Sequence, residues 1–147
     1  MSSLVCVDAS LGLSLVLPEN ASNRARDLWQ SWIENDVTVC APTLYLYESI
    51  SAIRGRVYRQ LLTPEEGDLA FQTLLAQPVD VFSPPELYGR AWNLAKTLRQ
   101  PKVYDSYYLA LAELLDCKFW TADERLYNTV RETLPWARWI GGGADSS

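Results

Sequence analysis

The segment VCVDAS, residues 5–10, is a short apolar run that stops at an aspartate and is followed by a helical pattern. Leu4 to Val7 are rich in β-branched and other apolar side chains, which predicts a short buried strand. Burying a lone carboxylate such as that of Asp8 is unfavourable unless a partner compensates its charge. The stretch therefore predicts both the first strand of the fold and a partner for Asp8.

Short apolar strands alternate with helical segments along the chain. Strands are predicted at residues 4–7, 37–41, 79–82, 118–121 and 138–140. Helices are predicted at residues 9–17, 23–33, 44–62, 64–76, 84–99, 104–115 and 123–132. This alternation predicts an α/β fold with a mainly parallel central sheet flanked by helices. Ligands of such sheets bind outside the carboxyl ends of the strands, so residues that directly follow a strand are candidate site residues.

The length of 147 residues and the hydrophobic content of 48% predict a single domain with a substantial core. We expect this domain to span residues 1–140 and the glycine-rich segment 141–147 to be a flexible C-terminal tail. The N-terminus lacks the positive region of a signal peptide, and no apolar run approaches the roughly 20 residues that span a bilayer. A soluble, cytoplasmic protein without a membrane partner is expected.

The cysteine and histidine content narrows the possible chemistry. Cys6, Cys40 and Cys117 lie in or beside apolar runs without a Cys-x-x-Cys pair, and the chain has no histidine. These facts argue against a zinc site and against a histidine base, and they favour buried, reduced thiols. The net charge of −5 argues against a nucleic-acid partner, but acids that gather around a bound cation are neutralised there.

Four acids stand at positions where parallel-sheet proteins place their sites. Asp8 and Asp123 follow predicted strands, whereas Glu48 and Asp105 lie in the first turns of helices. An acid near a helix N-terminus is favourable by itself, which is an alternative interpretation for Glu48 or Asp105 alone. Apolar neighbours around all four indicate a partly buried cluster instead, and such a cluster stays ionised only beside a cation. Oxygen ligands select hard cations, so the pattern predicts Mg²⁺ or Mn²⁺.

The segments around these acids resemble the four acidic blocks of PIN domains. They are VCVDAS (5–10), PTLYLYE (42–48), VYDSYYLALA (103–112) and FWTADERL (119–126). Their order and spacing are most similar to VapC-type toxins of bacterial and archaeal toxin–antitoxin pairs, and the resemblance extends to about Ile140. It implies a PIN-like domain, a Mg²⁺- or Mn²⁺-dependent endoribonuclease that hydrolyses RNA phosphodiester bonds, a homodimer, and a cognate antitoxin that holds the enzyme inactive.

The resemblance also assigns roles to individual positions. The matching positions are Asp8, Glu48, Asp105 and Asp123 as catalytic, metal-binding acids, and Ser10 and Thr121 as supporting polar residues. Two neighbours depart from the family pattern: Ser51 stands where many members carry asparagine, and Ser106 stands where alanine is common.

Several side chains are candidates for contact with RNA or with a protein partner. Arg54, Arg56 and Arg59 are candidate phosphate contacts, as are Arg90, Lys96, Arg99 and Lys102, although solvated helix faces explain them equally well. Tyr107 and Tyr127 are candidate base-stacking residues, with core packing as the favoured interpretation. The pairs Trp29 with Trp32 and Trp136 with Trp139 fit either a partner surface or the core.

Other classes fit the acids less well. A haloacid-dehalogenase-like phosphatase needs a second acid where this chain has Ser10, and a receiver domain needs a lysine after its last strand, whereas Lys118 precedes its strand. Two alternatives stay within the fold: a non-catalytic PIN-like binding partner, and a PIN ribonuclease that processes RNA without an antitoxin.

Overall fold

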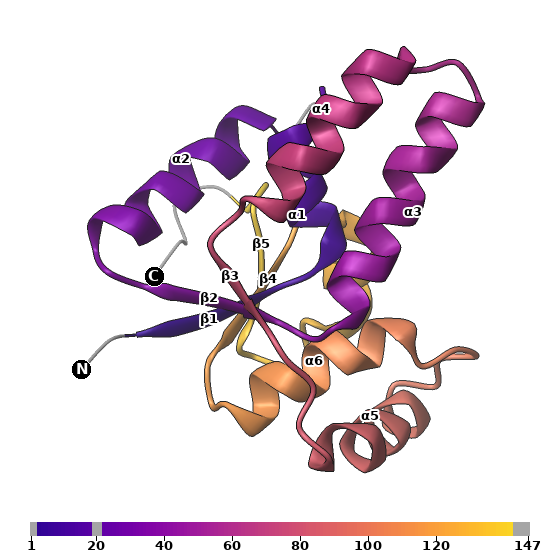
Figure 1. The fold of residues 1–147 in the computed structure, drawn as a ribbon. Coiled ribbons are helices and arrows are strands. Elements are labelled where there is room, and N and C mark those ends of the chain that lie inside the picture. The colour runs from indigo at the N-terminus through magenta and orange to yellow at the C-terminus, as the bar shows by residue number, and fades with distance from the viewer. Residues whose placement is uncertain (1–2, 19–21, 143–147) are drawn as a thin grey trace.

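A five-stranded parallel sheet runs through the computed structural model, which describes residues 3–18 and 22–142 (Figure 1). The strand order is β3-β2-β1-β4-β5, and every pair of neighbours is parallel. The strands are β1 (Leu4–Val7), β2 (Thr38–Ala41), β3 (Val79–Val81), β4 (Lys118–Thr121) and β5 (Ala137–Trp139). The predicted fold class is confirmed, and each predicted strand is present to within one residue at either end.

The helices also follow the predicted order. They are α1 (Ala9–Val16), α2 (Ser22–Glu34), α3 (Leu44–Tyr58), α4 (Pro64–Leu75), α5 (Glu86–Thr97), α6 (Tyr104–Leu114) and α7 (Glu124–Val130). The prediction that the third helix continues to Leu62 is wrong, because Gln60 adopts a left-handed conformation with φ of 62° that stops the helix. Thr63 and Glu66 then form a capping box that starts α4. α5 is also shorter than the predicted 84–99.

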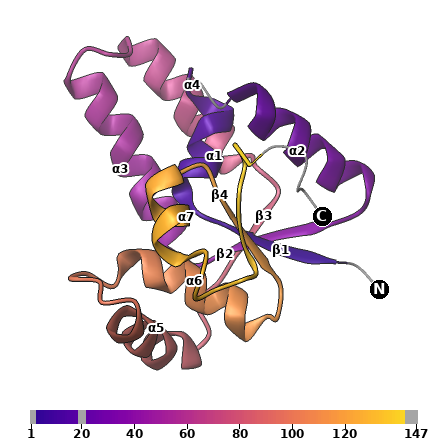
Figure 2. The ribbon, with the colours of Figure 1, turned by 180° about the vertical axis from the view of Figure 1, so that it is seen from behind.

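The helices form layers on the two sides of the sheet. α1 packs against α2, α3 and α4 on one side, and α5 and α6 pack together on the other (Figure 1). α7 packs against β4 and β5, as the view from behind shows (Figure 2). The central strands are consequently buried, whereas the carboxyl ends of β1 and β4 point toward the loops that lead into α1 and α7.

The order of the strands reverses between β1 and β4. From β1 the chain moves outward to β2 and β3, and it then crosses to β4 and moves outward the other way to β5. In open parallel sheets, such a switch point leaves a crevice outside the carboxyl ends of the two central strands. Asp8 and Asp123 lie beside this crevice, because Asp8 directly follows β1 and Asp123 follows β4 after one alanine.

The tryptophan pair Trp29 and Trp32 belongs to the buried core. Trp29 and Trp32 are buried with ring centroids 5.7 Å apart, and Trp32 contacts Trp120 of β4 edge-on. The alternative of a partner surface is therefore wrong for these two residues. Trp136 and Trp139 are half-buried.

Of the predicted C-terminal tail, residues 141–147, the structure describes residues 141 and 142. Gly141 lies against the Trp139 indole, because a Cβ at this glycine would come within 2.2 Å of the ring. Residues 143–147 of the predicted tail lie outside the described residues. Within residues 3–18 and 22–142, no helix is long and apolar enough to cross a membrane.

Candidate functional site

Asp8 is the buried centre of the candidate site. Its backbone is extended and its side chain caps the N-terminus of α1, where Oδ1 accepts a hydrogen bond from the Leu11 amide at 3.2 Å. Oδ1 also accepts one from the Ser10 hydroxyl at 2.7 Å, and Oδ2 accepts one from the Thr121 hydroxyl at 2.6 Å. These donors are neutral groups, so they orient the carboxylate without cancelling its charge.

Ser10 and Thr121 connect the ends of the two central strands. Their hydroxyl oxygens lie 3.1 Å apart, and Ser10 Oγ accepts a hydrogen bond from the Ala122 amide at 3.0 Å. Thr121 Oγ1 accepts a further bond from the Asp123 amide at 2.9 Å. The two hydroxyls therefore tie the loop after β1 to the loop after β4, which fixes Asp8 relative to Asp123.

Burial dominates the electrostatics of Asp8. Only 5% of the surface of Asp8 is exposed, and this desolvation raises the pKa of its carboxyl from the ordinary 3.8 to about 6. The hydrogen bonds from Ser10, Thr121 and the Leu11 amide oppose this rise in pKa, and the nearby Asp105 carboxylate adds to it. Ionisation of Asp8 in the folded protein therefore costs free energy, and a bound cation would offset this cost.

Asp105 lies in the first turn of α6, where the charges of Asp123 and Arg125 act on it. Burial and the Asp123 carboxylate raise the pKa of Asp105, and the Arg125 guanidinium lowers it. Asp123 caps the N-terminus of α7 by accepting a hydrogen bond from the Leu126 amide at 3.2 Å. Arg125 is therefore a cation from α7 that partly compensates Asp105.

Glu48 joins the site from α3. Its Oε1 accepts a hydrogen bond from the Tyr108 hydroxyl at 2.6 Å, which links α3 to α6. Burial raises the pKa of Glu48, the bond from Tyr108 opposes that rise, and the Asp105 carboxylate adds to it. The pKa of Tyr108 is also raised, by burial and by Glu48, so this hydroxyl stays protonated and donates.

Asp105 interacts electrostatically with each of the other three predicted acids. The described residues nevertheless contain no group of three or more His, Cys, Asp or Glu side chains already arranged around one ion. The donor set fits a hard cation, because it consists of carboxylate oxygens whose pKa values are raised by burial and mutual repulsion. Mg²⁺ in particular uses one or two protein carboxylates and keeps several waters.

A groove of about 560 Å³ leads away from the acids along α3. Its lining residues are Leu44, Tyr47, Glu48, Ser51, Ala52, Gly55, Arg56, Arg59 and Tyr104. Two of the three predicted RNA-binding arginines, Arg56 and Arg59, therefore share a groove with Glu48. Arg54 does not: it lines a separate hollow between α3 and α4, and its guanidinium lies 5.9 Å from the centre of the Tyr58 ring.

Other candidate contacts have structural partners. Arg90 forms a 2.7 Å ion pair with Glu113, and the Lys96 amine lies over the Trp92 ring. Tyr127 stacks on Trp139, and Tyr107 packs edge-on against Tyr88. These ring contacts favour the packing interpretation for both tyrosines.

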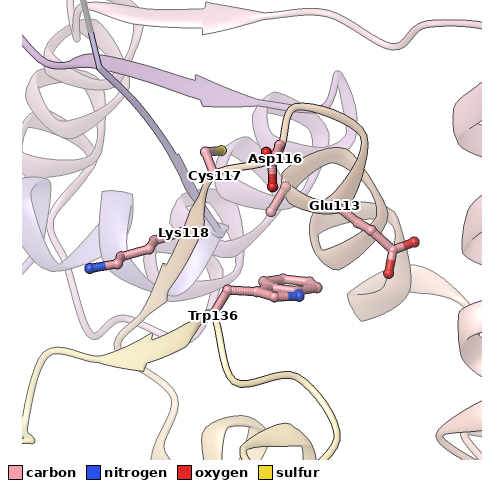
Figure 3. A pocket seen from close by; sticks show the side chains of 6 residues that line it. Glu113, Asp116, Cys117, Lys118 and Trp136 are labelled. Carbon is pink, nitrogen blue, oxygen red and sulfur yellow. The ribbon is translucent and has the colours of Figure 1, made fainter.

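The cysteines lie in or beside the central strands: Cys6 in β1, Cys40 in β2, and Cys117 directly before β4. Cys6 and Cys40 are buried, as predicted, and Cys117 is half-buried with its sulfur 3.7 Å from that of Cys6. Cys117 lines a hollow of about 200 Å³ with Trp136 and Lys118 (Figure 3). The three thiols are free.

Four side chains at this site have no role that the sequence alone predicts: Tyr47, Tyr104, Tyr108 and Arg125. Tyr47 and Tyr104 directly precede Glu48 and Asp105, so their places beside the acids are visible in the sequence. The bond from Tyr108 to Glu48 and the effect of Arg125 on Asp105 depend on how α3, α6 and α7 pack together. No local pattern signals these two contacts.

The fold and the placement of the acids define the class of protein. The PIN domain family model matches residues 5–132, and the chain belongs to this family. Among its relatives are VapC ribonucleases. The chain is 31% identical to VapC ribonuclease Mb0985 of Mycobacterium bovis over 132 residues, and this aligned segment covers 90% of the chain and 95% of the relative. It is 35% identical over 124 residues to Ribonuclease VapC12 of Mycobacterium tuberculosis, covering 84% and 89%.

Two solved structures share the fold. PAE2754 from Pyrobaculum aerophilum superposes with a TM-score of 0.70 at 19% identity, over 96% of this chain and 93% of its own. Mycobacterium tuberculosis VapC20, described as a sarcin-ricin loop cleaving toxin, superposes with a TM-score of 0.59 at 18% identity, over 80% and 87%. The predicted resemblance to VapC-type PIN domains is confirmed by the family match and the sequence relatives.

Proposed function

We propose that the chain is a Mg²⁺- or Mn²⁺-dependent endoribonuclease that hydrolyses RNA phosphodiester bonds and serves as the toxin of a toxin–antitoxin pair. The observation that carries this proposal is the buried Asp8 carboxylate, oriented by neutral hydroxyls and close to Asp105. The membership of the PIN domain family and the similarity to VapC ribonucleases support it.

The chain's own residues would bind and orient the reacting groups. Asp8 and Asp105 are the proposed principal ligands, with Asp123 and Glu48 binding directly or through water. A divalent cation at such a site lowers the pKa of bound water and stabilises charge on phosphoryl oxygens. Ser10 and Thr121 hold the Asp8 carboxylate in place, and Tyr108 holds Glu48 at the edge of the groove. One of the carboxylates would accept the proton of the attacking water.

Cleavage of a labelled RNA in the presence of Mn²⁺, with and without chelator, tests this proposal. We expect cleavage by the wild type, none with chelator, and a loss of about 100-fold or more for Asp105→Asn, the effect expected when electrostatic stabilisation is removed. Asp80→Asn, an exposed substitution on β3, is the matched control and should cleave normally. A non-catalytic PIN-like binding partner would show no cleavage under any of these conditions.

The toxin assignment, the homodimer, the cognate antitoxin and the cytoplasmic location are parts of the same proposal. The exposed apolar side chains of the α3–α4 region support a protein partner: Leu61, Leu69 and Leu75 are each more than half exposed, and Phe71 lies beside them in sequence. Induced expression tests the toxin role, because wild type should arrest growth and Asp105→Ala should not. Equal growth of both strains would refute the toxin role and leave the nuclease proposal to the cleavage assay.

A further inference from the structure

The groove along α3 has aromatic side chains at the acidic end and cationic side chains at the other. Tyr47 of α3 and Tyr104 of α6 line it beside Glu48, and Arg56 and Arg59 line it further along α3. Tyr47 is 70% exposed and Tyr104 is 52% exposed, although both rings are large and largely apolar. The two rings therefore line the groove and are not packed into the core.

Helix geometry explains how each tyrosine comes to lie at the rim. Consecutive residues of a helix point about 100° apart, so a side chain next to a half-buried acid turns outward from it. Tyr47 directly precedes Glu48, and Tyr104 directly precedes Asp105. Each acid can therefore face the interior of the site while the preceding tyrosine presents its ring to solvent at the same level of the helix.

We propose that Tyr47 and Tyr104 stack on unpaired bases of the RNA, so that the groove selects a single-stranded segment next to the cleaved phosphate. This inference rests on the proposed function and adds the residues that determine specificity. Exposed aromatic faces bind bases only when those bases are unstacked from their neighbours. In a duplex the neighbouring bases cover each base face, so Tyr47 and Tyr104 have no base surface to stack on.

The charges along the groove agree with a strand that runs from the acids toward Arg59. The Arg59 guanidinium lies over the helix at Gly55, because a Cβ added to that glycine would come within 3.1 Å of Arg59 Nη1. Arg56 lines the same part of the groove. Phosphates that follow the stacked bases would meet these two cations.

Fluorescence anisotropy with a labelled, unstructured RNA oligonucleotide tests the inference. The measurement uses Asp105→Asn protein with Mg²⁺ present, so that cleavage does not consume the probe. We expect Tyr47→Ala and Tyr104→Ala each to weaken binding by about 10-fold, the loss of one stacked base, and Tyr47→Phe and Tyr104→Phe to bind normally. Tyr58→Ala is the matched control, because Tyr58 is an exposed tyrosine of α3 that does not line the groove.

A hairpin duplex of the same composition provides the second probe. We expect it to bind more weakly than the single strand and to be insensitive to both alanine substitutions. The inference is overturned if the alanine variants bind the single strand normally, if Tyr58→Ala causes the same loss, or if the duplex loses affinity equally. It is also overturned if the substitutions leave RNA binding unchanged and abolish only the co-purification of a protein partner. Failure of the proposed function looks different, since wild type would then bind RNA but not cleave it.

Discussion

Replacing Asp8 with asparagine is expected to stabilise the metal-free protein at neutral pH. Asp8 is 5% exposed, and burial raises its pKa from 3.8 to about 6 in the folded state. The folded chain therefore binds this proton more tightly than the unfolded chain does, so ionisation of Asp8 destabilises the fold. The destabilisation is absent below pH 3.8, grows between there and about pH 6, and is complete above about pH 6.

The size of the effect follows from the difference in pKa. A shift of about two pKa units corresponds to about 3 kcal/mol in the free energy of unfolding. The asparagine amide would face the Thr121 hydroxyl, which must turn to accept a hydrogen bond instead of donating one, at a cost of about 1 kcal/mol. We therefore expect Asp8→Asn to be more stable than wild type by about 2 kcal/mol above pH 6.

Urea unfolding followed by tryptophan fluorescence in EDTA measures this difference directly. The comparison is made at about pH 4, where the destabilisation is close to its minimum, and at about pH 7.5, where it is complete. Asp27→Asn, an exposed substitution on α2, is the control and should differ from wild type by less than about 0.5 kcal/mol at both values. An Asp8→Asn variant that is less stable than wild type at the higher pH would refute the reasoning. So would a stability difference between the two proteins that does not grow with pH.

Three further predictions follow from the same contacts. Ser106→Ala should raise the free energy of unfolding by about 1 kcal/mol in urea titrations, because the buried Ser106 hydroxyl has no hydrogen-bond partner among the residues that the structure describes. Thr121→Val should lower stability at neutral pH by about 1–3 kcal/mol and slow RNA cleavage, since Asp8 loses its 2.6 Å hydrogen bond. Calorimetry should show that Mn²⁺ affinity falls as the pH drops below about 6, where Asp8 becomes protonated; an affinity independent of pH would contradict its role as a ligand.

The fold and the position of the acids could be predicted because both depend on local sequence. An apolar run that ends at Asp8 is a strand followed by a helix cap, and Asp123 repeats this arrangement after β4. Parallel strands place such caps at the same edge of a sheet. The end of α3 could not be predicted, because the apolar period continues through Leu61 while the left-handed Gln60 stops the helix.

The helical period of α3 explains why Arg56 and Arg59 line the groove with Glu48 whereas Arg54 does not. Counted from Glu48 at about 100° per residue, Arg59 and Arg56 lie at about 20° and 80°, whereas Arg54 lies at about 240°. Only the first two therefore share a side of α3 with the acid, as the structure places them. The electrostatic interactions of Asp105 with the other acids, by contrast, depend on how the helices that carry them pack together.

The central claim is that Asp8, Glu48, Asp105 and Asp123 together hold a hard divalent cation, and titration of Mn²⁺ into the metal-free protein by calorimetry tests it most directly. We predict saturable binding by wild type at neutral pH and a loss of affinity of at least about 10-fold for Asp105→Asn, because Asp105 interacts with the other three acids. Heats no larger than those of buffer for wild type, or equal affinities for the two proteins, would contradict the claim.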